Sequence, residues 1–194
     1  MKAPRRKLPS LPALARRFAG RRDGIAATEL ALIAPMLMLL FLGGAETALF
    51  VRTHYQAAQM ASTVADVVAR YEMVTSADVA AIMNVSADVM GVASFDPAGT
   101  VILSSVATDS SAAATVAWQC AGGELGKSSK VGAVGKAASL PGSLVLEADD
   151  NVIVAEVFYQ YTPLLGWTAP ATTLVYKTAL FRPRLGSLTT APGC

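Results

Sequence analysis

The sequence predicts an α+β protein in which a long N-terminal transmembrane helix continues into a small extracytoplasmic domain with an antiparallel sheet. Three observations predict this: an uncharged apolar stretch at residues 30–45, a helical apolar stripe that follows it, and strand-like segments in the C-terminal half. A composition of 53% hydrophobic and 15% charged residues in 194 residues argues against a disordered chain and favours a membrane segment.

The first 24 residues form a basic leader that sets the orientation in the membrane. Residues 1–24 carry eight Lys or Arg and one Asp, whereas residues 25–194 carry eight Lys or Arg and thirteen Asp or Glu. Because Lys and Arg accumulate on the cytoplasmic side of membrane helices, we expect a cytoplasmic leader and an outer C-terminal domain. The acidic outer chain disfavours nucleic-acid binding.

The predicted transmembrane helix covers residues 25–51. Its centre, Leu30–Ala45, has no charged residue, and Glu29 and Glu46 are the only acidic interruptions of the stretch. At ~1.5 Å per residue such a helix is about 40 Å long, which suffices for a hydrocarbon layer of about 30 Å. We expect Glu46 to mark the outer interface.

Three interpretations of residues 1–51 are compatible with this pattern. A cleavable secretory signal has a shorter apolar stretch, and its cleavage region would coincide with Glu46. A plain single-pass anchor fits the length and the charge. In the third interpretation the chain is cut after Gly24, and the new amino group of Ile25 pairs with Glu29 of a neighbouring copy. That pairing would offset the cost of a carboxylate in an apolar helix.

The residues around Gly24 carry a family resemblance. The segment Arg22–Pro35 combines the end of a basic run, Gly24, a few small residues, Glu29 and a proline before a leucine-rich run. This pattern resembles the N-terminal segment of TadE-like proteins, the pseudopilins of tight-adherence (Flp-type) pilus systems. The sequence differs from the family pattern at Leu30, where Phe or Tyr is usual.

The resemblance implies a minor pilin-like subunit, or pseudopilin, which acts by membrane insertion and helix packing. It implies cleavage by a prepilin peptidase between Gly24 and Ile25, and an assembly role for Glu29 and Pro35. The implied location is the bacterial inner membrane, single-pass, with a periplasmic C-terminal domain and incorporation into a surface pilus. The implied partners are the lipid bilayer, the major pilin, other pseudopilins, the inner-membrane pilus platform and the prepilin peptidase. An unprocessed, membrane-anchored envelope binding module is the alternative.

The outer domain, residues 52–194, is expected to begin with a continuation of the same helix to about Val74. Apolar residues recur there at spacings of three and four, which places them on one helix face. These residues are Ala57, Met60, Val64, Val67, Tyr71 and Val74. A second helix is predicted from Thr75, which with Asp78 can form a cap, to about Met90.

Four later segments have the composition of strands. Residues 100–107, 115–120, 152–162 and 172–181 are rich in β-branched and aromatic residues. In the third segment one alternating set is more uniformly apolar and is expected to face the helices. This set is Ile153, Ala155, Val157, Tyr159 and Tyr161. The Gly-rich residues 121–143 are expected to form an exposed loop.

The residue inventory gives little support to catalysis or to cofactor binding. The chain has one histidine, His54, and two cysteines far apart in sequence, which match neither a Ser-His-Asp arrangement nor the spacing of a zinc site. Residues 121–128 fit a phosphate-binding loop only if Ala121 replaces its first glycine. We therefore expect no enzyme, no metal and no cofactor.

The two cysteines, Cys120 and Cys194, are expected to form one disulfide bond. The outer compartment is oxidising, and an even cysteine count favours pairing. The bond would hold the C-terminus beside the second strand and stabilise the domain by roughly 3–5 kcal/mol in the chain-entropy model.

Overall fold

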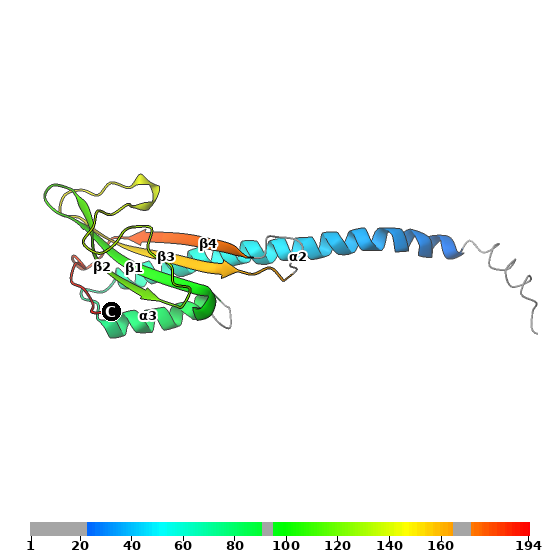
Figure 1. Ribbon diagram of the computed structural model, residues 1–194, viewed down its shortest axis with the longest axis horizontal. Coiled ribbons are helices and arrows are strands. Elements are labelled where there is room, and N and C mark those ends of the chain that lie inside the picture. The colour runs from blue at the N-terminus through cyan, green and yellow to red at the C-terminus, as the bar shows by residue number, and fades with distance from the viewer. Residues whose placement is uncertain (1–22, 91–94, 165–171) are drawn as a thin grey trace, which may run out of the picture. The chain divides into compact units, whose positions relative to one another are not determined.

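The computed structural model describes residues 23–90, 95–164 and 172–194. Within these residues two α-helices precede four strands, and short 3-10 helices lie at Asp96–Ala98 and Pro141–Ser143. Figure 1 labels the α-helices and the strands. The chain divides into two compact units, Met1–Ala45 and Glu46–Cys194. The first helix, α2, spans Asp23–Val68, so the boundary between the units lies within it.

The described part of the first unit is helical and apolar. Among the residues that the structure describes, the helix Gly24–Val68 is long and apolar enough to cross a membrane. Its most apolar stretch has a mean hydropathy of 2.2, and none of the residues in that stretch is buried. The large exposed side chains of this unit are Ile25, Leu30, Leu32, Ile33, Met36, Leu37, Met38, Leu39, Leu40 and Phe41. Exposing a contiguous apolar surface to water is unfavourable, so this segment requires lipid or protein around it.

The second unit contains the end of α2 and the whole of α3, Ser76–Val89. At the start of α3, Thr75 Oγ1 accepts a hydrogen bond from Asp78 N at 3.3 Å, and Asp78 Oδ2 accepts one from Thr75 N at 3.0 Å. This reciprocal capping box confirms the predicted helix start. Helix α2 ends before the predicted Val74, because the amides of Arg70 and Tyr71 close tighter turns onto carbonyls three residues earlier.

The four strands form one antiparallel sheet in the order β2-β1-β3-β4. Strand β1 is Gly99–Thr108, β2 is Ala114–Gly122, β3 is Asn151–Tyr161 and β4 is Thr173–Phe181. All four predicted strands are therefore confirmed, to within one or two residues at most ends.

The main core of the second unit lies between the sheet and the helices. The alternating set predicted to face the helices does so: Ile153, Ala155 and Val157 are completely buried in one cluster with α2 residues such as Met60 and Val64. The spacing of three and four along α2 and of two along β3 brings these apolar stripes together.

The opposite face of the sheet is also buried, because part of the segment between β2 and β3 packs on it. Residues 121–143 were expected to form an exposed loop, and for Val131 this expectation is wrong. Val131 and Leu146, from the segment between β2 and β3, pack against Val106, Val152 and Val154. Residues 135–138 also pair with the edge of β2, where Val116 N donates to the carbonyl of residue 136 at 3.1 Å. Part of the Gly-rich segment therefore covers the sheet.

Candidate functional site

The predicted processing residues lie at the beginning of α2. Gly24 is helical, and a Cβ added to it would meet no atom within 4 Å. A glycine inside a helix is less favourable than alanine by about 1 kcal/mol, yet neither backbone conformation nor packing within the described chain requires it here. Glycine at this position therefore has no explanation in the folded chain itself.

Ile25 and Glu29 are separated by about one helical turn, some 6 Å along the axis. Both are exposed in the first unit, and between them Thr28 Oγ1 donates to Ile25 O at 2.8 Å. The unpaired amides of a helix N-terminus carry partial positive charge, so a carboxylate near this end is favourable. A new ammonium at Ile25 would add positive charge to the same end and strengthen the attraction for Glu29 or its equivalent.

Pro35 lies inside α2 without ending it. Proline has no amide hydrogen, so the carbonyl of Ala31 lacks its usual donor four residues later. In a membrane, neighbouring helices or local adjustment must satisfy such a carbonyl.

Glu46 begins the second unit and is buried there rather than free at a surface. Its side chain is 7% exposed, and its Oε1 accepts hydrogen bonds from Tyr161 Oη at 2.5 Å and from Leu164 N at 3.3 Å. Burial, and then the adjacent Glu46 carboxylate, raises the pKa of Tyr161 to about 12. Phe50 packs edge-on against the same tyrosine ring at 5.4 Å. These contacts fix α2 to the end of β3.

The comparison with protein families bears on this helix. Residues 24–66 match the family model of TadE-like proteins. The resemblance inferred from residues 22–35 is thus confirmed over the apolar helix and its continuation. No curated protein and no solved structure matches the chain. The family match covers the apolar helix and its continuation, which together make up less than a quarter of the chain.

Downstream of the TadE-like segment, the chain ends in a strap, residues 182–194, that holds the second unit together. The first part of the strap packs beside the end of α2. There Arg184 N donates to Ala69 O at 2.8 Å, and Arg184 Nη2 lies 2.5 Å from Asp66 Oδ1. Further along, the backbone of Leu188 accepts from Trp118 Nε1 at 2.7 Å and donates to Asn151 Oδ1 at 2.9 Å.

The strap finishes at the disulfide bond between Cys120 and Cys194. Their Cα atoms are 5.6 Å apart, within the usual range for a disulfide. The structure therefore forms the pairing that the even cysteine count favours. The two hydrogen bonds of the Leu188 backbone, to Trp118 and Asn151, are called the Leu188 clamp below. Neither sequence spacing nor periodicity indicated this clamp, because its partners lie 37 and 70 residues away.

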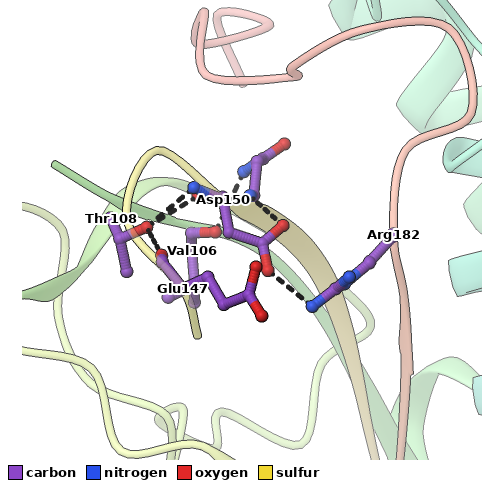
Figure 2. A network of polar contacts seen from close by, with 6 residues as sticks. Val106, Thr108, Glu147, Asp150 and Arg182 are labelled. Atoms are coloured by element: carbon purple, nitrogen blue, oxygen red, sulfur yellow. Dashed lines mark hydrogen bonds and ion pairs between the residues drawn. The ribbon is translucent and has the colours of Figure 1, made fainter. Parts of the chain in front are cut away.

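A second polar network joins the ends of three strands, as Figure 2 shows. Thr108 Oγ1 donates to Glu147 O at 2.5 Å and accepts from Asp150 N at 2.8 Å. Arg182 Nη2 lies 2.7 Å from Asp150 Oδ2 and so connects the start of the strap to this network. Asp150 thus serves the turn before β3.

Glu156 is a fully buried carboxylate on the face of the sheet away from the helices. It accepts hydrogen bonds from Ser129 Oγ, from Lys130 N at 2.9 Å and from Tyr176 Oη at 2.8 Å. Burial, and then the neighbouring Glu156, raises the pKa of Tyr176. Three donors satisfy the carboxylate and hold the segment between β2 and β3 onto the sheet.

Within residues 23–90, 95–164 and 172–194, no three His, Cys, Asp or Glu side chains gather so as to hold a metal ion. His54, the histidine considered above, packs its ring edge-on against Phe50 at 4.5 Å.

Proposed function

We propose that this chain is a pseudopilin, a minor pilin-like subunit that acts in the assembly of a tight-adherence (Tad) pilus. The proposal rests on one observation: the segment that matches the TadE-like family contains an apolar helical stretch none of whose residues is buried. Such a helix needs lipid before assembly and other helices after it. Membrane insertion followed by helix packing supplies both.

The membrane span that we propose is residues 25–45, the part of the expected span 25–51 that precedes the second unit. The second unit begins at Glu46, whose carboxylate is buried against Tyr161, and Phe50 also packs in that unit. A helix of 21 residues, 25–45, is about 32 Å long, close to the ~30 Å hydrocarbon layer. The basic leader then stays in the cytoplasm and the second unit lies in the periplasm.

We further propose that a prepilin peptidase cuts between Gly24 and Ile25. Glycine at position 24 has no packing role in the described chain, which supports a requirement imposed by another protein. Cleavage removes the leader and creates an ammonium at Ile25 at the beginning of the helix.

The role proposed for Glu29 is to neutralise that ammonium on an adjacent subunit. Inside the bilayer the effective dielectric constant is low, so an ion pair there is much stronger than in water. The pair would also offset the cost of holding a carboxylate among lipid chains. Pro35, which leaves one carbonyl without its donor, would ease local adjustment of the helix during assembly.

The partners that follow from this role are those of a pilus subunit in the membrane. They are the lipid bilayer, the major pilin, other pseudopilins, the inner-membrane platform and the prepilin peptidase. An unprocessed anchor for an envelope binding module is the competing function, and the two differ in whether residues 1–24 remain on the mature chain.

The variant Glu29→Gln tests the assembly role. It keeps the size of the side chain but cannot pair with an ammonium, so we expect normal membrane insertion and a large loss of pilus output or of incorporation into the pilus. Glu147→Gln removes one exposed carboxylate from the second unit and serves as the control. Normal pilus output from Glu29→Gln would contradict the proposed role.

A further inference from the structure

A hollow of about 370 Å³ lies in the second unit between α3 and the end of β2. Helix α3 lines it with one face, at positions three or four residues apart. These residues are Ser76, Val79, Ala80, Met83 and Asn84. The facing wall consists of Phe95, Val101, residues 121–123 and Cys194. The volume is at the lower end of small-ligand sites and accommodates one long side chain.

Glycines keep this wall free of side chains. A Cβ on Gly122 would lie 3.1 Å from Met83 Cγ, and a Cβ on Gly123, where φ is +92°, would lie 2.4 Å from the carbonyl oxygen of Gly99. Gly99 in turn leaves room for the ring of Phe95, which an added Cβ would meet at 2.3 Å. Larger residues at these positions would distort the wall or fill the hollow.

The lining combines an apolar floor with a negatively charged mouth. Phe95 and Val101 are buried at the floor, while Asp96 and Glu124 are exposed at the mouth. Glu124 N donates to Asp96 O at 2.7 Å, which keeps these two residues side by side. Among the residues that the structure describes, none of those that line the hollow is Lys, Arg or His. An apolar floor beneath carboxylates matches a side chain with a methylene stem and a cationic head.

We propose that this hollow binds a lysine or arginine side chain presented by an exposed segment of a partner protein. The stem would pack against Phe95 and Met83, and the cationic head would reach Asp96 and Glu124. The net charge favours a different protein over a second copy of this chain. Residues 25–194 carry thirteen acidic and eight basic residues, so two copies of this part of the chain repel each other. The site lies wholly in the second unit, so it does not depend on cleavage at Gly24.

The test uses the full chain in neutral maltoside micelles and a fluorescein-labelled hexalysine peptide, with binding followed by fluorescence anisotropy. The pair Asp96→Asn and Glu124→Gln removes the charge at the mouth. Ala80→Trp fills the hollow from an exposed helix position and leaves both carboxylates in place. The matched control, Glu147→Gln with Asp149→Asn, removes two charges from another exposed surface.

We expect saturable binding to the unaltered chain and at least a tenfold loss of affinity in the Asp96/Glu124 pair and in Ala80→Trp. The Glu147/Asp149 control should change affinity by less than twofold. Unchanged binding in Ala80→Trp would overturn the proposal, because attraction to an acidic surface would then suffice. An equal loss in the control, or no saturable binding to the unaltered chain, would overturn it as well.

Discussion

The carboxylate of Glu46 accepts a hydrogen bond from the phenol of Tyr161, 115 residues later in the chain, at the point where the second unit begins. Glu46 lies in the segment that matches the TadE-like family, and Tyr161 is the last residue of β3. This contact therefore lies at the point where α2 enters the second unit.

Removing the hydroxyl of Tyr161 should destabilise the second unit. Tyr161→Phe leaves the buried Glu46 carboxylate without one of its donors, and we expect a loss of about 1–3 kcal/mol in the free energy of unfolding. Denaturation of the detergent-solubilised chain, followed by tryptophan fluorescence, measures it. Tyr55→Phe is the control, since Tyr55 is 75% exposed. Equal stability of the two variants would contradict a role for the contact.

Glu156 should be more sensitive than an exposed glutamate. In Glu156→Gln a neutral amide faces three hydrogen-bond donors, so one of them loses its acceptor, and we expect a loss of about 1–3 kcal/mol. Glu147→Gln, at an exposed position, should stay within about 0.5 kcal/mol of the unaltered chain. The same denaturation experiment compares them, and equal midpoints would show that the buried carboxylate does not hold the covering segment.

Loss of the disulfide bond should cost more than either single substitution. The two cysteines are 74 residues apart, and in the chain-entropy model closing such a loop contributes about 4 kcal/mol. We expect Cys120→Ser with Cys194→Ser to unfold at a lower denaturant concentration than the oxidised chain. The unaltered chain in a reducing agent should behave like this variant; if reduction changes nothing, the bond does not contribute.

The cap of α3 gives a pH dependence with a defined sign. Hydrogen bonds from the side chain and then the backbone of Thr75 hold the pKa of Asp78 below its ordinary value of 3.8. Since the folded-state pKa is the lower one, this stabilisation is present above that value and is lost as the pH falls through the folded-state pKa. Asp78→Ala should therefore lower the melting temperature at pH 7, and the difference should shrink as the pH falls below 3.8.

The control for this experiment is Asp88→Ala, at the other end of the same helix. A carboxylate there faces the negative end of the helix dipole, so its removal should not lower the melting temperature. If both variants lose stability equally at neutral pH, the cap is not the cause.

The periodic elements of the fold could be predicted from sequence. The three- and four-residue spacing of α2, the Thr75–Asp78 cap and the two-residue alternation of β3 are local patterns, and each led to the correct element. The burial of the second sheet face could not be predicted. Val131 and Leu146 stand alone in a Gly-rich, non-periodic segment, and their partners on the sheet follow from the tertiary fold.

The candidate sites divide in the same way. Gly24, Ile25, Glu29 and Pro35 could be proposed because a short motif carries them, and the family match covers that segment. Their proposed partners are other molecules, so a single chain does not test the roles. Glu156 and the Leu188 clamp were missed because their contacts join residues tens of positions apart.

The identity of the first residue of the mature protein tests the central proposal most directly. The chain should be isolated from the membranes of its own cells, and its N-terminus determined by mass spectrometry or Edman sequencing. The proposal predicts that the chain starts at Ile25, with the leader and Gly24 removed and a free amine next to Glu29. A mature chain that still starts at Met1 would contradict it, because the ammonium needed for the Glu29 pair would never form in the membrane.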